Sequence, residues 1–200
     1  MEERAGSGLT PSGQAVFWSG FEAGGRPFRV AATEKGACRL SLPGEDAGAF
    51  FRWLAVRFTR ARLVEDPARL EPYAAVVRAC LRGEAAHPVV PLDPIGTPFQ
   101  RAVWEVVAGI PRGTTLAYGE IAKRLGFPQA SRAVGAAVAS NPLPLFIPTH
   151  RVVASDGSVP GYGPSVPIKE ELLRLEGILP RGRSEPGPVA SSPPALPASP

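Results

Sequence analysis

The sequence predicts an α+β fold, in which a small sheet with helices precedes a mainly helical region. Runs of β-branched and aromatic residues, separated by Gly-containing turns, fill residues 15–42. From residue 50 onward, apolar residues recur at helical spacing. Two short helices joined by a Gly-containing turn are then expected near residues 117–140, which is the pattern of a helix-turn-helix.

Residues 14–93 are expected to form a small α/β domain. Strands are predicted at 15–20, 28–33 and 37–42, and the turn signals between them favour an antiparallel three-stranded sheet. A further short strand is expected near 62–64, between two helices. The apolar faces of these helices are Phe50, Phe51, Leu54 and Phe58, and then Leu70, Tyr73, Ala74, Val77 and Leu81. No pattern in this part indicates chemistry, so we interpret it as a supporting domain.

Residues 94–179 are expected to form a second domain. Its first helix begins with two consistent signals, because Thr97 and Gln100 make a capping box and Pro98 takes the first helical position. The apolar face of this helix is Phe99, Val103, Val106, Val107 and Ile110. The last helix is predicted at 166–176, with Ile168, Leu172 and Leu175 directed inward and Gly177 as the C-terminal cap.

The helix-turn-helix is predicted from helices at 117–125 and 131–140, and Asn141-Pro142 ends the second helix. That helix is rich in small side chains: Ala133, Gly135, Ala136, Ala137, Ala139 and Ser140. Small side chains allow another backbone to approach closely. Two explanations therefore remain open, namely tight packing against another helix and insertion into a nucleic-acid groove. A hairpin-like segment is then predicted at 151–159, folded about Asp156-Gly157.

Composition narrows the class of protein. The 200 residues are 44% hydrophobic, and no apolar run approaches the roughly 18 residues of a membrane span, so a soluble globular protein is expected. The N-terminus lacks the apolar segment of a signal peptide, so cytoplasmic localisation is expected.

Cys38 and Cys80 lie far apart without CxxC spacing and are expected to be buried small hydrophobes in a reducing compartment. Neither a metal site nor a cofactor is predicted. Residues 1–13 and 180–200 are rich in Gly, Ser or Pro and are expected to be disordered tails.

The positive charge is concentrated in residues 112–151. This segment holds Arg112, Lys123, Arg124, Arg132 and Arg151 against a single acidic residue, Glu120, and its formal charge equals the +4 of the whole chain. Such a segment is typical of a solvated face or of a site for a polyanion. Charge alone does not decide between them.

Six short blocks resemble, in order, those of the O6-alkylguanine-DNA alkyltransferases. They are GTPFQ-x3-W (96–104), IPRGTT-x2-YGEIA (110–122), SRAVGAAVASNP (131–142), IPTHRVV (147–153), Gly161-Tyr162 and LLRLEG (172–177). The match is close over residues 96–178 and looser, in layout, over 14–95. One block alone would be weak, but six in order identify the chain as a member of this superfamily. The resemblance implies that the N-terminal domain is RNase H-like.

The resemblance also implies roles for single residues in binding double-stranded DNA that contains O6-alkylguanine. Tyr118 takes the place of the tyrosine that presses on the phosphate of the target nucleotide. Arg132 takes the place of the arginine that fills the gap left by the flipped base. Together with small residues set against the minor groove, the expected DNA-binding set is Tyr118, Arg132, Ala133, Gly135, Ala136, Ser140 and Arg151.

The same resemblance assigns an activation frame and a base pocket. Asn141 matches the asparagine that ties the active-site turn to the recognition helix. His150 and Glu176 match the pair that, through a water, withdraws a proton from the acceptor cysteine. The base pocket is expected from Pro148, Val153, Tyr162, Gly163 and Ser165.

The acceptor position itself holds Thr149, where the family signature Pro-Cys-His-Arg has cysteine. Alkyl transfer from guanine O6 is an attack on an sp³ carbon, which suits a thiolate because proteins lower the pKa of a cysteine from near 8.5. An aliphatic hydroxyl ionises far less readily, and threonine nucleophiles act mainly in acyl transfer. Recognition of the lesion does not need the nucleophile. We therefore expect damage recognition without alkyl transfer.

Three functions are kept as hypotheses. The first is a non-enzymatic damage-recognition protein, which resembles the alkyltransferase-like proteins that flag lesions for nucleotide-excision repair, although those are often short and lack an N-terminal domain. The second is an active suicide methyltransferase that uses an unforeseen nucleophile, in a methylated-DNA–protein-cysteine S-methyltransferase whose cysteine was lost or replaced. The third is a helix-turn-helix regulator of transcription. The resemblance further implies a monomer, associated with the nucleoid, whose partners include nucleotide-excision repair proteins.

Overall fold

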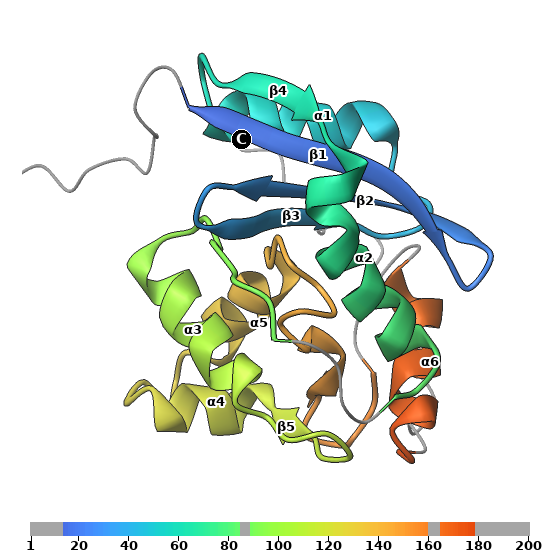
Figure 1. Cartoon of the computed structure of the whole chain (residues 1–200). Coiled ribbons are helices and arrows are strands. Elements are labelled where there is room, and N and C mark those ends of the chain that lie inside the picture. Colours follow the sequence, from blue (N-terminus) through green and yellow to red (C-terminus); the bar gives the residue numbers. More distant parts are fainter. Residues whose placement is uncertain (1–13, 85–88, 160–164, 179–200) are drawn as a thin grey trace, which may run out of the picture.

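The computed structural model describes residues 14–84, 89–159 and 165–178 of the chain. Within these ranges the chain forms a small sheet and a set of helices, so the predicted α+β fold is confirmed (Figure 1). The predicted tails and the base-pocket residues Tyr162 and Gly163 lie outside the described ranges. Over the described residues, none of the helices combines the length and the hydropathy that a membrane-spanning segment needs.

The main sheet has four strands rather than the three expected. The strands β1 (Ala15–Ala23), β2 (Arg26–Thr33) and β3 (Gly36–Ser41) form the predicted antiparallel meander. The short strand β4 (Arg62–Glu65) then pairs in parallel with β1, which gives the order β3-β2-β1-β4. Helix α1 (Ala47–Arg57) connects β3, at one edge of the sheet, to β4 at the other edge, where β4 lies beside β1. A four-residue strand has too little pattern of its own to predict that pairing.

The two faces of this sheet are covered by different helices. Helix α1, capped by Asp46, packs Phe50, Leu54 and Phe58 against one face. The other face is covered by α2 (Pro67–Leu81), which Asp66 caps, and by the C-terminal helices. The larger core cluster contains β-strand residues such as Phe28 together with Trp104 and Ile121. The division at residues 93 and 94 therefore stays a prediction, since both parts contribute to one core.

Helix α3 (Pro98–Ala108) begins with the predicted capping box, in which Thr97 and Gln100 bond to each other's backbone N–H. Its buried face holds Val103 and Val107, as expected, and also Trp104, which the sequence analysis did not place there. The Trp104 indole donates a hydrogen bond of 2.7 Å to the carbonyl of Ala137. This contact fixes α3 against the second helix of the helix-turn-helix.

The helix-turn-helix consists of α4 (Tyr118–Arg124) and α5 (Ser131–Ala139), close to their predicted bounds. The turn begins at Gly126, whose φ of +81° favours glycine. The short strand β5 (Leu116–Ala117) precedes α4 and pairs in parallel with β6 (Val152–Val153). The chain turns at Asp156-Gly157, as the predicted hairpin-like segment requires, because the Ala154 N–H bonds to the Ser158 carbonyl and the Gly157 N–H to the Ala154 carbonyl. The sequence did not predict that β6 also pairs with β5.

The last helix, α6 (Ser165–Leu175), lies beside α2 (Figure 1). Ile168 and Leu172 are buried as predicted, but the expectation for Leu175 was wrong because its side chain is 37% exposed. Leu173 is buried instead. Leu175 lies against Gly83 at the end of α2, in a contact between distant segments that helical periodicity alone does not show.

Candidate functional site

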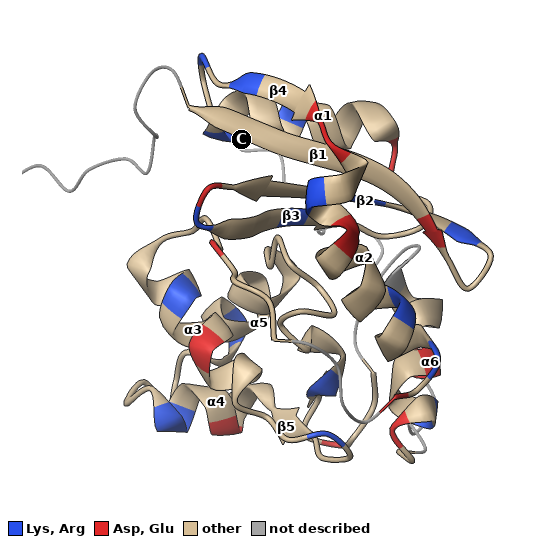
Figure 2. Cartoon of the chain, viewed as in Figure 1, with Lys and Arg blue, Asp and Glu red and all other residues tan. Residues whose placement is uncertain are grey.

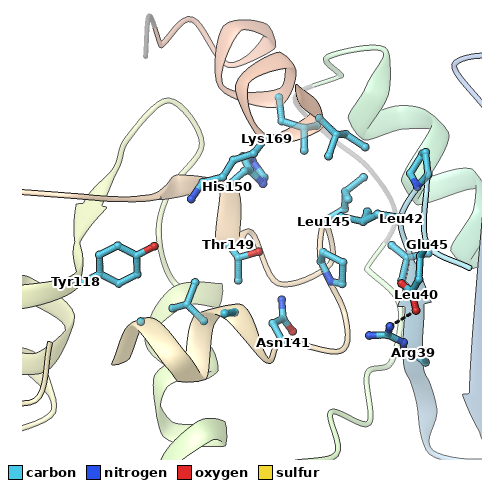
Figure 3. A pocket seen from close by; sticks show the side chains of 17 residues that line it. Arg39, Leu40, Leu42, Glu45, Tyr118, Asn141, Leu145, Thr149, His150 and Lys169 are labelled. Carbon is cyan, nitrogen blue, oxygen red and sulfur yellow. Dashed lines mark hydrogen bonds and ion pairs between the residues drawn. The ribbon is translucent and has the colours of Figure 1, made fainter. Parts of the chain in front are cut away.

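A pocket of about 550 Å³ lies between the sheet and the C-terminal helices (Figure 3). One wall comes from β3 and the loop after it, and a second comes from α5. The segment 141–150 and helix α6 complete it. The pocket is therefore lined by both parts of the chain that the sequence predicts as separate domains, 14–93 and 94–179.

Thr149 lines this pocket at the start of a 3-10 turn, η1 (Thr149–Arg151). Tyr118 lies at one end of the pocket, with its hydroxyl directed inward (Figure 3). Burial raises the pKa of Tyr118 above its ordinary value, so the phenol is neutral at physiological pH. The turn thus presents a hydroxyl group where the resemblance places the acceptor thiol.

Asn141 connects the end of α5 to the turn that carries Thr149. Its buried side chain donates to the Ile147 carbonyl at 3.2 Å and accepts from the Leu143 N–H at 3.0 Å. Between these two anchors, Leu145 has a φ of +71°, a conformation that costs most L residues roughly 1–2 kcal/mol. The hydrogen bonds of Asn141 hold this strained turn in place, which fixes Thr149 relative to α5.

A buried network lies behind Thr149, and we call it the His150–Glu176–Arg151 network. The Nε2 of His150 lies 2.9 Å from the Glu176 carboxylate, and the two side chains are 7% and 4% exposed. Arg151 donates to the same carboxylate through Nε and Nη2, and to the Ile110 carbonyl through Nη1. One carboxylate therefore binds two residues of the turn, His150 and Arg151.

The charge states of this network follow from burial and hydrogen bonding. Burial alone would raise the pKa of Glu176, but hydrogen bonds from His150 and Arg151 outweigh it and hold the pKa at about 2. Burial lowers the pKa of His150, and the hydrogen bond to Glu176 opposes that change. At neutral pH the network holds a carboxylate beside a neutral imidazole whose Nε2–H donates, which leaves Nδ1 as a proton acceptor.

The basic segment divides into two groups. Arg112 donates to the Gly83 and Leu175 carbonyls, and Arg151 belongs to the buried network, so both act within the protein. Lys123, Arg124 and Arg132 are exposed on α4 and α5. Figure 2 shows basic residues on α3, α4 and α5, with acidic residues also on α3 and α4. The sequence could not separate the two groups, because their roles depend on which carbonyls and carboxylates the fold brings close.

The two faces of α5 decide between the explanations left open for its small residues. Val134, Ala137 and Val138 are buried, and Ala137 accepts the Trp104 hydrogen bond. The opposite face is exposed and consists of Arg132, Ala133, Ala136, Ala139 and Ser140. Helix packing therefore explains Ala137 but not the exposed small residues. Apart from Arg132, that face has only small side chains and is open to an approaching partner.

The predicted base-pocket residues are only partly described. Pro148 and Val153 are buried and do not line the pocket. Ser165 is the first residue of α6, and its side chain lies outside the description, as do Tyr162 and Gly163. Gly135 lines the pocket, and a side chain there would lie about 3.9 Å from the Tyr118 ring.

Several pocket residues were missed by the sequence analysis. Lys169 lines the pocket from α6, seven residues before Glu176, which directly follows this helix, and its Nζ donates to the Val152 carbonyl at 2.7 Å. Burial lowers the pKa of Lys169 to about 8. Arg39 and Glu45 line the end nearest β3. A position two turns from Glu176 was a usable signal for Lys169, whereas nothing local in the sequence marks Arg39.

The two cysteines lie away from this chemistry. Cys38 is buried with the α1 core on the other face of the sheet, and burial raises its pKa far above the ordinary value. Burial also raises the pKa of Cys80. Neither lines the pocket. Over the described ranges, no group of three or more His, Cys, Asp or Glu residues is arranged to hold a metal ion.

Comparison with known proteins gives one consistent picture. The profile of the 6-O-methylguanine DNA methyltransferase DNA-binding domain matches residues 98–178. The inducible methylated-DNA–protein-cysteine methyltransferase of Bacillus subtilis is 40% identical over 149 residues, which are 74% of this chain and 83% of that protein. The corresponding protein of Methanosarcina acetivorans is 48% identical over 101 residues, 50% of this chain and 65% of its own length.

A solved structure with a similar fold contains DNA. The crystal structure of Mycobacterium tuberculosis OGT in complex with DNA has a TM-score of 0.67 and 32% sequence identity to this chain. The match covers 80% of this chain and 92% of that one. It therefore includes both the sheet and the helix-turn-helix.

Proposed function

The chain belongs to the family of O6-alkylguanine-DNA alkyltransferases, and from that premise we propose that it recognises O6-alkylguanine in DNA without removing the alkyl group. In this proposal α5 binds the minor groove and the damaged base is flipped into the pocket. The alkyl group then lies beside Thr149, at the position of the acceptor, but it is not transferred to the protein. Double-stranded DNA is the partner.

The exposed face of α5 supports the DNA-binding step. Ala133 and Ala136 face outward and Arg132 stands beside them, so the helix backbone has room to approach a groove while one cation reaches further. Lys123 and Arg124 are exposed on the neighbouring helix and suit the phosphate backbone. In the proposal Arg132 fills the gap left by the flipped base, and Tyr118 presses on the phosphate of the same nucleotide.

The fate of the flipped base depends on Thr149, and this observation carries the proposal. The His150–Glu176–Arg151 network holds the imidazole of the residue after position 149 with Nε2 on Glu176. In the proposal, the free Nδ1 of this imidazole would assist ionisation of a thiol at position 149. A threonine hydroxyl is too weak an acid for the same neutral imidazole to deprotonate to a useful extent. The pocket is therefore equipped for binding, while the bond between the alkyl carbon and O6 stays intact.

The consequences of binding belong to the same proposal. A lesion that is bound but not repaired needs other proteins to remove it, and nucleotide-excision repair proteins are the partners that we propose. The protein would act as a monomer in the cytoplasm, associated with the nucleoid. Arg151 is assigned here to positioning Glu176 rather than to DNA, because its three nitrogen atoms all donate within the protein.

Two measurements test the proposal. Binding to a duplex with one O6-methylguanine should be at least about 10-fold tighter than to the undamaged duplex, and should weaken steeply as salt is added. The intact mass of the protein should not change after incubation with the methylated duplex. A gain of one methylene's mass would refute the proposal and favour the methyltransferase alternative, which the names of the relatives support. Equal affinity for both duplexes would favour a regulator without lesion preference.

A further inference from the structure

The exposed arginines that lack a carboxylate partner lie in two separate groups. Within the described ranges, some exposed arginines form an ion pair, as Arg69 does with Glu34 and Arg82 does with Glu84. Others are exposed there without an ion pair, namely Arg57, Arg60, Arg62, Arg101, Arg124 and Arg132. The last three lie on α3, α4 and α5, whereas the first three lie where α1 ends and β4 begins (Figure 2). The proposed function accounts for the cations of the helix-turn-helix but not for those at α1 and β4.

We call Arg57, Arg60 and Arg62 the α1–β4 arginine surface. They follow one another closely in the sequence, and residues 47–64 contain no Asp or Glu. The Arg57 guanidinium lies over the Trp53 ring, 5.6 Å from its centroid, which holds the charge in place at the surface. Arg60 has a φ of +76°, a backbone conformation that favours glycine, although the residue is an arginine. Like charges in such a cluster repel one another, so a bound anion would stabilise all three.

Guanidinium groups gathered in this way suit the phosphate backbone of DNA. Each guanidinium can donate two parallel hydrogen bonds to one phosphate, and a duplex presents one negative charge per roughly 1.7 Å of its axis. Contacts to phosphate groups carry no sequence information, so binding at this surface would depend neither on the sequence nor on a lesion. Charge complementarity therefore favours the backbone of double-stranded DNA as the partner.

The α1–β4 arginine surface and the exposed face of α5 lie on different sides of the main sheet. Helix α1 packs Phe50 and Leu54 against one face, whereas Val134 and Ala137 of α5 belong to the core on the other face. Figure 1 shows α1 and β4 at one end of the molecule and α4 and α5 at the opposite end. DNA is stiff over roughly 150 base pairs, so a duplex bound along α5 does not turn back to reach α1. A phosphate backbone at the arginine surface therefore belongs to another segment of DNA.

Building on the proposed function, in which α5 binds the damaged duplex, we infer that the α1–β4 arginine surface binds the phosphate backbone of a second segment of double-stranded DNA. One protein molecule then holds two segments at once. The damaged segment is recognised through its lesion, whereas the second segment is bound only through its charge. No covalent step is involved.

The first experiment tests the arginine surface apart from α5. Ala136→Glu should weaken binding through α5, so the affinity that this variant retains for an undamaged duplex is measured as salt is added. The logarithm of the association constant should fall with the logarithm of the salt concentration with a slope of about −3, if each arginine neutralises one phosphate. Addition of Arg57→Gln, Arg60→Gln and Arg62→Gln to this variant should lower the remaining affinity at least about 10-fold. Equal affinity with and without the three arginines would overturn the inference.

The second experiment measures bridging directly. A duplex with one O6-methylguanine is fixed to beads and loaded with protein, and a labelled undamaged duplex is then added. The unmodified protein is expected to retain the labelled duplex on the beads. The triple variant Arg57→Gln/Arg60→Gln/Arg62→Gln should still load within about 2-fold, which shows that it is folded, but should retain at least about 10-fold less of the labelled duplex. Undiminished retention by the triple variant would contradict the inference.

The matched control is Arg69→Gln/Arg82→Gln/Arg174→Gln, which removes the same charge from exposed arginines that are already paired with carboxylates. It should retain the labelled duplex nearly as well as the unmodified protein. An equal loss in the control would assign the effect to net charge and overturn the role of the arginine surface. If the protein showed no preference for beads with the methylated duplex over beads with an undamaged one, the proposed function would fail, while the experiment with Ala136→Glu would still decide the inference.

Discussion

The buried network behind Thr149 and the exposed face of α5 use different physical means. In the His150–Glu176–Arg151 network, charged groups are sheltered from solvent and each depends on its partners. The exposed face of α5 has almost the opposite character, because Ala133 and Ala136 are exposed and their small side chains leave space. The buried network depends on fixed hydrogen bonds, whereas the exposed face of α5 depends on small side chains that leave room for a partner.

The difference separates stability and activation from recognition. Loss of a partner in the buried network leaves an unpaired charge inside the protein, so it should first affect folding. Added bulk on α5 costs the free protein nothing and should affect only the complex with DNA. Thr149 belongs to neither region. It occupies the position that decides whether a recognised lesion also loses its alkyl group.

The largest effect is expected for Arg151→Met. Removal of the guanidinium leaves the Glu176 carboxylate buried with one partner fewer, which should lower the free energy of unfolding by about 3 kcal/mol in urea titrations. Arg174→Gln is the control, because Arg174 pairs with Glu170 on the surface of the same helix and should contribute about 0.5 kcal/mol or less. If Arg151→Met kept full stability and lost affinity for DNA, Arg151 would belong to the DNA interface instead.

A smaller effect is expected for Ala136→Glu, which should weaken DNA binding without lowering the stability of the fold. The added carboxylate would lie against the phosphate groups of the minor groove, and affinity for the O6-methylguanine duplex should fall about 100-fold. The free energy of unfolding should stay within about 0.5 kcal/mol. Ala55→Glu, at an exposed position of α1, should leave binding nearly unchanged. Tight DNA binding by Ala136→Glu would show that α5 does not enter the groove.

The smallest effect concerns pH. The pKa of Glu176 in the folded protein, about 2, is below its ordinary value of 4.5, so Glu176 stabilises the fold fully above pH 4.5. This stabilisation is lost as the pH falls from 4.5 to 2, and should amount to about 2 kcal/mol. The difference in unfolding free energy between the unmodified protein and Glu176→Gln should therefore shrink over that interval. A constant difference would mean that Glu176 is not held as a carboxylate by its neighbours.

The exposed region was more predictable from the sequence than the buried one. The bounds of α4 and α5 follow from Gly126, Asn141-Pro142 and apolar spacing, all of which are local signals. The capping box at Thr97 is equally local and is confirmed. The contact between His150 and Glu176 was expected from the resemblance, whereas the carbonyl contacts of Arg112 and Arg151 were not.

What the sequence could not provide depends on long-range packing. The parallel pairing of β4 with β1 requires knowledge of where α1 crosses the sheet. The part played by β3 in the pocket requires knowledge of how the sheet lies against α5 and α6. For the same reason residues 14–93 were interpreted as a support, although Arg39 and Glu45 reach the pocket. The partial exposure of Leu175 likewise depends on where α6 lies relative to the end of α2, since Leu175 is beside Gly83 there.

The central claim is that only the nucleophile is missing, and Thr149→Cys tests it most directly. The variant and a Thr149→Ser control are incubated with a duplex that contains O6-methylguanine, and the intact mass of each protein is measured. The account predicts that the cysteine variant gains the mass of one methylene in proportion to the methylated DNA supplied, while the serine variant and the unmodified protein gain nothing. A cysteine variant that binds the methylated duplex but gains no mass would contradict the claim, because the network and the pocket would then not be ready for transfer.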